Sequence, residues 1–379
     1  MEEMKNSTSP RKVLIIINSL RRGGIEIAAV NFQSHLDRQK YDCTYFIRSS
    51  ENKDEALLSD ILGSGAEIFE KPLGMNNYFK EYIFFKKFFK KNQFDIVHSH
   101  LLFYNGIVMR AAYKSGIKKR IAHSHATKRN KRMGRIKSVL QSIYENLMRS
   151  WLKKYATDIV ACSNEAGRFL YGEKEFNRRG IVLYNGINTE NYNFDSQRKK
   201  EARERLGIST ELTVGHVGSI YWIKNQEFLI KVFFEILKIN PDSELLLIGE
   251  ICDGGSAQRM TESLGISQKV KFLGVRSDIP DLLSAMDVFV FPSLFEALPI
   301  APIEAQAAKL PCLISDSVTQ EIRQNKNVEF LSLNESVSTW AEKAISLSKE
   351  DRLSVSRDNL IEVYDINKVV RKLENIYES

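Results

Sequence analysis

Short runs of apolar residues alternate along the chain with longer stretches in which apolar and polar positions follow a helical period. Continuous apolar strands separated by helices are typical of parallel βαβ units, because such strands are buried on both faces. The first half of the chain shows this pattern in predicted strands at Val13–Asn18, Cys43–Ile47, Phe94–His98, Arg120–His123, Asp158–Ala161 and Ile181–Leu183.

The same pattern starts again after a polar stretch at Asn188–Lys200, which we take as a linker. Two successive sets of strands and helices predict an α/β protein with two Rossmann-like, doubly wound parallel-sheet domains, 1–190 and 191–362. A last helical segment, within 363–379, could close the second domain or return to the first. The second set has predicted strands at Leu212–His216, Glu244–Ile248, Val270–Phe272, Val288–Phe291 and Cys312–Ile314, and helices at Gln226–Ile239, Ile279–Ala285 and Pro302–Ala308.

Composition agrees with a two-domain globular protein. The chain has 379 residues, of which 43% are hydrophobic, enough for two cores. No apolar run reaches the length of a membrane-spanning helix, and the first ten residues lack a signal-peptide pattern, so we expect a cytoplasmic protein. The four cysteines are far apart in sequence, without metal-ligand spacing, and we expect reduced thiols.

The net charge of +8 is unevenly distributed. Residues 1–195 carry 33 Lys and Arg against 20 Asp and Glu, a net of +13, and the rest carries a net of −5. A basic tract, Arg110–Lys137, has 11 basic residues and no acidic one. Such a field attracts nucleic acid, an anionic membrane surface or a diphosphate-bearing substrate. No nucleic-acid-binding module accompanies the tract, so nucleic acid is not an expected partner.

Two glutamates stand in the segment after the strand that ends at Phe291. We expect Glu296 on a loop and Glu304 in the first turn of a helix that starts near Pro302. Carboxylates there could accept hydrogen bonds from vicinal hydroxyls, such as those of a ribose. The backbone of the loop and helix start, at Leu298, Pro299 and Ile300, could hold a phosphate. The alternative is that both glutamates only cap and solvate the helix.

Other glycine-containing turns also follow predicted strands. Gly218 ends one strand, Ser219 follows it, and Lys224 stands just before a helix, where a lysine is a mobile charge suited to a diphosphate. Lysines before helices are common, so this signal alone is weak. Gly23 and Gly24 follow the first strand and let a ligand approach the backbone. They do not complete a G-x-G-x-x-G fingerprint, so a dinucleotide is poorly supported.

Four of the six histidines form two His-Ser-His clusters, His98 with His100 and His123 with His125. Both clusters follow predicted strands, and residues two apart at a strand end point the same way. These histidines therefore either contact a substrate or are structural. No carboxylate lies close to them in sequence, so we expect neither a metal nor a cofactor. Another ambiguous element is the aromatic, lysine-rich helix predicted at Tyr78–Lys91, which could enter an anionic bilayer surface or pack on the sheet.

Eight segments of the chain together resemble sequences of glycosyltransferase family four, which has the GT-B fold, and especially its bacterial capsular and exopolysaccharide members. They occur in the family's order and span nearly the whole chain. The segments are Gly23–Glu26 (GGIE), Asp95–His100 (DIVHSH), Arg120–His125 (RIAHSH), Ala161–Gly167 (ACSNEAG), Leu183–Asn188 (LYNGIN), Lys224–Ile230 (KNQEFLI), Phe272–Leu283 (FLGVRSDIPDLL) and Phe291–Pro311 (FPSLFEALPIAPIEAQAAKLP).

The resemblance implies a nucleotide-sugar donor in a cleft between the two domains. Glu304 would bind the ribose, Glu296 the donor sugar, and Lys224 the diphosphate, and His125 would be the active-site histidine. The resemblance also implies retention of anomeric configuration, no metal, and a final helix that crosses back to the first domain. Further nucleotide-binding residues would be Gly218, Ser219, Gly249, Val275, Arg276, Leu298, Pro299 and Ile300; donor or acceptor contacts would come from Gly23, Gly24, His100, His123, Lys128 and Arg129.

Three positions depart from the family pattern. Ser219 stands where an arginine is common, and Ala297 and Lys309 stand where glycine is usual. Lys309 or Arg276 could replace the missing arginine charge. We therefore expect a retaining glycosyltransferase that moves a sugar, with UDP-sugar as the favoured donor, to a saccharide or polyprenyl-diphosphate-linked saccharide in surface polysaccharide synthesis. A non-catalytic partner of another transferase and a nucleotide-sugar epimerase are the alternatives.

Overall fold

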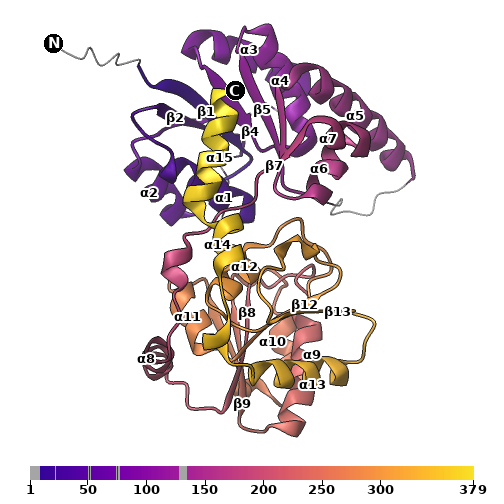
Figure 1. Ribbon diagram of the computed structural model, residues 1–379. Helices are drawn as coiled ribbons and strands as arrows, with labels where there is room; N and C mark the ends of the chain where they lie inside the picture. Colours follow the sequence, from indigo (N-terminus) through magenta and orange to yellow (C-terminus); the bar gives the residue numbers. More distant parts are fainter. Residues whose placement is uncertain are drawn as a thin grey trace, which may run out of the picture. The chain divides into compact units, whose positions relative to one another are not determined.

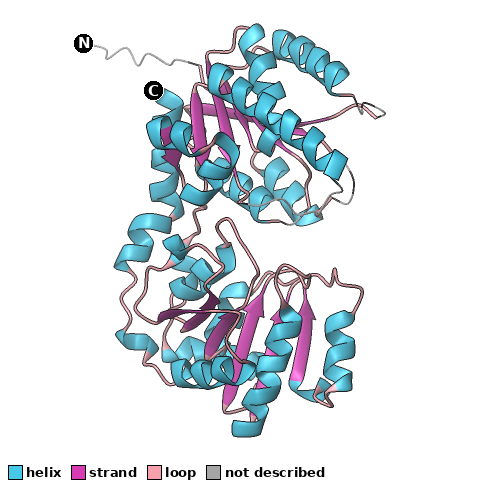
Figure 2. Cartoon of the chain, turned by 90° about the vertical axis from the view of Figure 1, so that its right-hand side faces the viewer, coloured by secondary structure: helices cyan, strands magenta, loops and turns pink. Residues whose placement is uncertain are grey.

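The computed structural model describes residues 9–21, 23–49, 51, 53–73, 75, 77–127 and 135–379. The chain divides into two compact units, Met1–Gly186 with Ile366–Ser379 (unit 1) and Ile187–Asp365 (unit 2). Each unit is a parallel sheet with helices on both faces, which confirms the predicted α/β class with two Rossmann-like domains (Figure 1, Figure 2). The sequence analysis divided the chain at 190/191 and 362/363, whereas the units change at 186/187 and 365/366.

The described part of unit 1 is built on a seven-stranded sheet in the order β3-β2-β1-β4-β5-β6-β7. Its order turns back between β1 and β4, and in open α/β sheets ligands bind beyond the carboxyl ends of strands at this switch point. The strands are β1 (Arg11–Ile17), β2 (Tyr41–Ile47), β3 (Glu67–Glu70), β4 (Ile96–Ser99), β5 (Lys119–Ser124), β6 (Asp158–Ala161) and β7 (Gly180–Val182).

Alternate residues of the central strands face two helical layers. Val13, Ile15 and Ile17 of β1 belong to a core formed with α1, α2 and the last helix, α15. On the other face, Phe46 of β2 contacts Phe85 of α3. Both faces are covered, which explains the continuous apolar runs of these strands. The helices are α1 (Gly24–His35), α2 (Glu55–Gly63), α3 (Tyr78–Asn92), α4 (Asn105–Lys114), α5 (Arg135–Tyr155), α6 (Asn164–Tyr171), α7 (Glu173–Arg179) and α15 (Ile366–Glu378).

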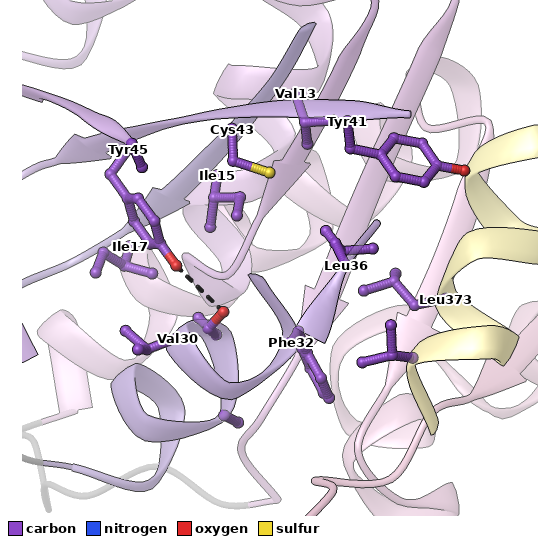
Figure 3. Close-up of a cluster of buried hydrophobic side chains, with 14 of the residues drawn as sticks. Val13, Ile15, Ile17, Val30, Phe32, Leu36, Tyr41, Cys43, Tyr45 and Leu373 are labelled. Atoms are coloured by element: carbon purple, nitrogen blue, oxygen red, sulfur yellow. Dashed lines mark hydrogen bonds between the residues drawn. The ribbon is translucent and has the colours of Figure 1, made fainter. Parts of the chain in front are cut away.

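The last helix, α15, completes the core of unit 1 although it follows unit 2 in sequence. Leu373 is fully buried and lies beside Leu36, at the end of α1 (Figure 3). Gly186 and Ile366 meet where the chain enters and leaves unit 2, because a Cβ on Gly186 would stand 2.8 Å from Cδ1 of Ile366. Of the two alternatives for the final segment, the structure shows the return to unit 1.

Unit 2 repeats the design with a six-stranded sheet in the order β10-β9-β8-β11-β12-β13. Its switch point lies between β8 and β11. The strands are β8 (Leu212–Val217), β9 (Ser243–Ile248), β10 (Val270–Gly274), β11 (Val288–Phe291), β12 (Cys312–Ser315) and β13 (Val328–Leu331). The helices are α8 (Ser196–Leu206), α9 (Gln226–Ile239), α10 (Ser256–Ser263), α11 (Ile279–Ala285), α12 (Ile300–Ala307), α13 (Val337–Ser348) and α14 (Asp358–Tyr364).

The prediction of a linker at Asn188–Lys200 is wrong. This stretch contains a 3₁₀ turn (Thr189–Tyr192) and the start of α8. Asn188 and Asp195 are N-caps of these two elements, so part of the polar character of the stretch comes from capping rather than from solvation. Thr189 and Tyr192 are buried, and the Thr189 hydroxyl donates a 2.6 Å hydrogen bond to Asp365. The segment is therefore an integral part of unit 2.

The aromatic helix α3 mostly packs on its sheet. Phe85 and Phe89 are buried, while Tyr78 and Phe79 at its start are exposed. The packing alternative therefore describes most of this helix. Among the described residues, no helix is both long and apolar enough to cross a membrane.

We predict that Leu373→Ala destabilises unit 1 by about 2–5 kcal/mol, because it deletes a buried side chain and leaves a cavity. Urea unfolding followed by circular dichroism measures the change. Lys372→Ala, one position away and exposed, is the matched control. Equal stability of the two variants would contradict the place of α15 in this core.

Candidate functional site

A charged pair lies at the switch point of unit 2. Lys224 is on the loop after β8, and Glu296 is on the loop after β11. The Lys224 Nζ atom lies 2.6 Å from Oε1 of Glu296 and 5.0 Å from the centre of the Phe291 ring. The two side chains are 22% and 17% exposed, so the pair is half-buried yet open to a ligand. Lys224 and Glu296, predicted to bind the diphosphate and the donor sugar and 72 positions apart in sequence, are thus in direct contact.

A buried network fixes the loop that carries Lys224. The Gln226 amide nitrogen donates to the Ser219 carbonyl at 2.9 Å, and its amide oxygen accepts from the Tyr221 N–H at 3.1 Å. The same amide nitrogen lies 3.2 Å from Nε2 of His216. His216 Nδ1 lies 3.0 Å from the Val290 carbonyl, which can only accept, so Nδ1 carries the proton and Nε2 accepts from Gln226. The sequence analysis missed His216 and Gln226, which contact each other only in the folded chain.

Two glycines that were predicted to bind the nucleotide, Gly218 and Gly249, approach each other closely. Gly218 has φ of 152° and Gly249 has φ of 145°, values that other residues rarely adopt. A Cβ on Gly249 would lie 2.2 Å from the Gly218 carbonyl oxygen and 2.9 Å from the Ser219 nitrogen. The Gly218 N–H donates to the Ile248 carbonyl at 2.8 Å. Glycine is therefore required at 249 to bring the two loops together.

Glu304 occupies a different position on α12 from the one expected. The helix begins at Ile300 rather than near Pro302, so Glu304 lies beyond the first turn. Pro302 is the third residue of the helix, where its missing N–H still costs nothing. The Glu304 carboxylate accepts a 2.6 Å hydrogen bond from the Tyr192 hydroxyl. Of the predicted phosphate-holding residues, Leu298 is buried, Pro299 is the N-cap, and Ile300 is the first helical residue.

Arg276 and Lys309, the two candidates to replace the arginine charge that Ser219 lacks, differ in their surroundings. Arg276 donates two hydrogen bonds to Asp278, at 2.8 and 2.6 Å, so its guanidinium is already paired. Val275 beside it is exposed. Lys309 has φ of 55°, a left-handed conformation, which explains why glycine is usual there in the resembling family. Ala297 is not among the described non-glycine residues that have a positive φ, so an alanine fits at this position without backbone strain.

The glycine turn of unit 1 lies over a buried carboxylate. Gly23 is the N-cap of α1 and Gly24 is its first residue. A Cβ on Gly23 would lie 2.7 Å from Oε2 of Glu26, whereas a Cβ on Gly24 would meet nothing within 4 Å. Glu26 accepts a 3.3 Å hydrogen bond from Ser19, and burial raises the pKa of its carboxyl group. Glu26 was not predicted as a site residue, although the GGIE segment contains it.

The two His-Ser-His clusters form a block of hydrogen-bonded rings beside the switch point of unit 1. His98 and His123 lie within β4 and β5, not after them, and His100 and His125 follow directly. His98 Nε2 is 3.1 Å from His123 Nδ1, with the ring planes 1° apart. His100 Nδ1 is 2.9 Å from His125 Nε2. The Tyr377 hydroxyl of α15 is 3.0 Å from His98 Nδ1, which extends the chain of hydrogen bonds.

This block is built as neutral hydrogen-bonded pairs. Nitrogens of His98, His100 and His123 lie within 4.8 Å of one another, close enough to raise the question of a metal. Two nitrogens bound to one tetrahedral ion at about 2.0 Å lie about 3.3 Å apart, so the 3.1 Å spacing matches a pair of metal ligands as well as a hydrogen bond. Burial, aided by neighbouring rings, holds the pKa of His100 and His123 well below the usual range.

Two ring nitrogens of the block point to a missing partner. Within the described part of the chain, His123 Nε2 and His125 Nδ1 are buried without a hydrogen-bond partner. Buried polar atoms normally have one, so a ligand or water could satisfy them. The remaining donor and acceptor candidates, Lys128 and Arg129, lie outside the described residues, as does part of the basic tract.

We predict that the protein loses stability as pH falls from about 6.5. Burial lowers the pKa of His98 and His125 to about 3 and that of His216 to about 4, against 6.5 in the unfolded chain. Between these values only the unfolded chain takes up protons, so each histidine costs about 1.4 kcal/mol per pH unit. Thermal unfolding at pH 7.5, 6.5 and 5.5 measures the slope.

The control for this pH series is His35→Gln, which removes an exposed histidine of α1 and should leave the slope unchanged. A melting temperature that stays constant from pH 7.5 to 5.5 would contradict the neutral, buried state of the histidines.

Comparisons with known proteins agree with this arrangement of two parallel-sheet units. The model "Glycosyltransferase Family 4" matches residues 22–191, and "Glycosyl transferases group 1" matches residues 211–350. The Bacillus subtilis (strain 168) protein EpsF, named as a glycosyltransferase, is 31% identical over 98% of this chain and 97% of its own length. The Staphylococcus aureus capsular polysaccharide biosynthesis glycosyltransferase CapH is 26% identical over 97% of this chain and 99% of its own.

An Escherichia coli relative has a more specific name. It is the UDP-Gal:α-D-GlcNAc-diphosphoundecaprenol α-1,3-galactosyltransferase, 27% identical over 86% of this chain and 87% of its own. Among solved structures, Anabaena HepE in complex with UDP-glucose has a TM-score of 0.76 and 16% identity, and the match covers 97% of this chain and 99% of HepE. At that identity the likeness shows the fold alone.

Proposed function

Since this chain belongs to glycosyltransferase family 4, we propose that it is a retaining enzyme that moves a sugar from a UDP-sugar to a lipid-linked saccharide acceptor. The relatives indicate the coarser function, a glycosyltransferase of polysaccharide biosynthesis. The observation that supports a diphosphate-bearing donor is the contact between Lys224 and Glu296 at the switch point of unit 2, where folds of this class bind ligands.

In this proposal unit 2 binds the donor. Lys224 lies in a half-buried position where its charge stabilises the leaving diphosphate, with help from backbone N–H groups of the neighbouring loops. Glu296 holds Lys224 in place and accepts hydrogen bonds from sugar hydroxyls. Glu304 and the Tyr192 hydroxyl, which are already joined, bind the ribose hydroxyls. Ser219 supplies no charge, so the enzyme depends on Lys224 more than a relative with an arginine would.

The proposed chemistry is a front-face displacement. The bond between the anomeric carbon and the β-phosphate oxygen breaks, and the acceptor oxygen bonds to that carbon on the same face. The acceptor proton passes to the departing phosphate oxygen. The Glu26 carboxyl group is buried and hydrogen-bonded to Ser19, and burial raises its pKa, so this scheme does not use it as a covalent nucleophile. No metal is needed in this scheme, because Lys224 offsets the phosphate charge.

Unit 1 would bind the reacting end of the acceptor and its diphosphate. The unpartnered nitrogens of His123 and His125 can bond to hydroxyls of the reacting sugars. The E. coli relative's named acceptor carries a diphosphate on a polyprenol, and the basic tract of this chain suits such an anion. A polyprenol is held in a bilayer, so the enzyme would work at an anionic membrane surface.

An apolar stripe on α5 supports this membrane contact. Val139, Leu140, Ile143 and Leu147 lie on one side of the helix and are about half exposed. Tyr144 of the same helix stacks on the exposed Tyr78 of α3, with ring centres 5.5 Å apart. An amphipathic surface of this kind binds bilayers by burying apolar side chains below cationic ones.

We predict that Lys224→Ala lowers kcat by at least about 10²–10³-fold, the usual effect of losing one charge-stabilising donor. Glu304→Ala should mainly weaken nucleotide binding. Transfer and hydrolysis of a panel of UDP-sugars, followed by UDP release in EDTA, measures both. Lys231→Ala, an exposed lysine of α9, is the control. Near-normal turnover by Lys224→Ala would contradict the proposal, as would activity that requires a divalent ion.

The same assay separates the alternatives. An epimerase converts the sugar nucleotide without releasing UDP. A non-catalytic partner releases none, even from purified protein with donor in excess.

We predict that Leu140→Asn with Ile143→Asn weakens binding to vesicles of phosphatidylcholine and phosphatidylglycerol by about tenfold or more. Fully burying one such side chain is worth about 1.5–3 kcal/mol. Vesicle sedimentation measures the change. The matched control replaces two equally exposed apolar residues of unit 2, Ile239→Asn with Leu353→Asn. If both double variants bind like the unchanged protein, α5 is not the membrane contact.

A further inference from the structure

A cavity of about 390 Å³ lies beside the proposed donor site, within unit 2. It opens between the loop after β8 and the loop after β9, at the carboxyl edge of the sheet. Its volume is at the lower end for ligand pockets, which suits a ligand of monosaccharide size rather than a whole nucleotide sugar. None of the residues that line it was predicted as a site residue, and of those residues only Gln226 and Tyr221 also have a part in the proposed donor site, where their contact helps to fix the loop of Lys224.

The cavity has an exposed aromatic wall. The Trp222 side chain is 53% exposed, although tryptophan is among the residues that gain most from burial. Its ring makes edge contacts with Phe295, at 5.9 Å between ring centres, and with Tyr221, at 5.8 Å. These two contacts hold the indole in place. Phe295 directly precedes Glu296, and Trp222 is two residues from Lys224. The aromatic wall therefore adjoins the charged pair.

The polar lining of the cavity is acidic and rich in acceptors. Its eight lining residues include the carboxylates Glu227 and Asp253 and no lysine or arginine. Asp253 accepts hydrogen bonds from Gly255, Ser256 and Ala257, three of the roughly four that a carboxylate can accept. Such a lining repels a phosphate and accepts hydrogen bonds from hydroxyls. It fits a neutral, hydroxyl-rich ligand.

The walls of the cavity are fixed by main-chain bonds. Ile220 pairs with Ile251 across the two loops, and its N–H donates to the Glu250 carbonyl at 2.7 Å. The Cys252 N–H donates to the Ile220 carbonyl at 2.9 Å. A preformed pocket loses little conformational entropy on binding.

We propose that this cavity is a saccharide subsite in which a neutral pyranose ring of the acceptor stacks on Trp222. The C–H face of the ring packs on the indole, and its hydroxyls donate to Glu227 and Asp253. The assignment to the acceptor rests on the proposed transferase function. Trp222 is then a specificity-determining residue that positions the acceptor without taking part in bond breaking.

Cys252 provides a direct test, because it lines the cavity and is exposed while Cys43, Cys162 and Cys312 are buried. Its alkylation by N-ethylmaleimide is followed by mass spectrometry with methyl glycosides of glucose, galactose and N-acetylglucosamine. We expect at least one glycoside to slow the alkylation saturably. In Trp222→Leu the half-protecting concentration should rise at least tenfold, while Trp222→Phe should keep most of the protection. Tyr113→Leu, an exposed aromatic of unit 1, is the matched control.

Calorimetry with UDP separates failure of the subsite from failure of the proposed function. We expect Trp222→Leu to bind UDP like the unchanged protein. Protection that is equal in Trp222→Leu, or absent with every glycoside, overturns the subsite. A tenfold loss of UDP affinity in Trp222→Leu also overturns it, because the cavity would then hold the nucleotide. If the unchanged protein fails to bind UDP, the proposed UDP donor fails, whatever the glycosides do.

Discussion

The amide of Gln226 is the constraint on which the proposed donor site depends. It joins the Ser219 carbonyl, the Tyr221 N–H and His216, and so fixes both ends of the turn before α9. Each of these buried polar groups would be costly if left unpaired, so the loop has little freedom to rearrange. Lys224 extends from this fixed loop to Glu296, and Trp222 is presented on its outer side. The same few hydrogen bonds thus determine where the charge and the aromatic ring stand.

The two units have the same architecture but differ in the charge of the side chains near their switch points. At the switch point of unit 2 a lysine and a carboxylate form a half-buried ion pair. Beside the switch point of unit 1 the histidine block is buried and neutral, and its unpartnered nitrogens can bond to hydroxyls but add no charge. This difference in charge is the reason for assigning the diphosphate to unit 2 in the proposed function.

The sequence predicted the strands that appear as apolar runs and missed two strands whose apolar residues are interrupted by glutamates. Strands such as Val288–Phe291 are buried on both faces and read as apolar runs. The edge strands β3 and β13 contain glutamates, which break the apolar run and left them unpredicted. Strand alternation predicts that the two histidines within each cluster point the same way. Contact between the two clusters also requires β4 to pair with β5, which the sequence of a single chain does not show.

The candidate site divides in the same way. Lys224 and Glu296 were predicted from their positions after strands, and the structure brings them together. Gln226 gave no signal, because an amide at a helix start usually faces solvent. Trp222 gave none either, since its exposure and the adjoining cavity exist only in the folded chain. The placement of Glu304 was wrong because a proline was taken for the first helical residue, whereas proline is also tolerated at the third.

A crystal structure of the protein with bound UDP tests the central claim most directly. We expect diphosphate oxygens within hydrogen-bonding distance of Lys224 Nζ and the ribose hydroxyls on Glu304, with the Gln226 contacts unchanged. UDP bound elsewhere in unit 2, with Lys224 still paired only to Glu296, would contradict the account.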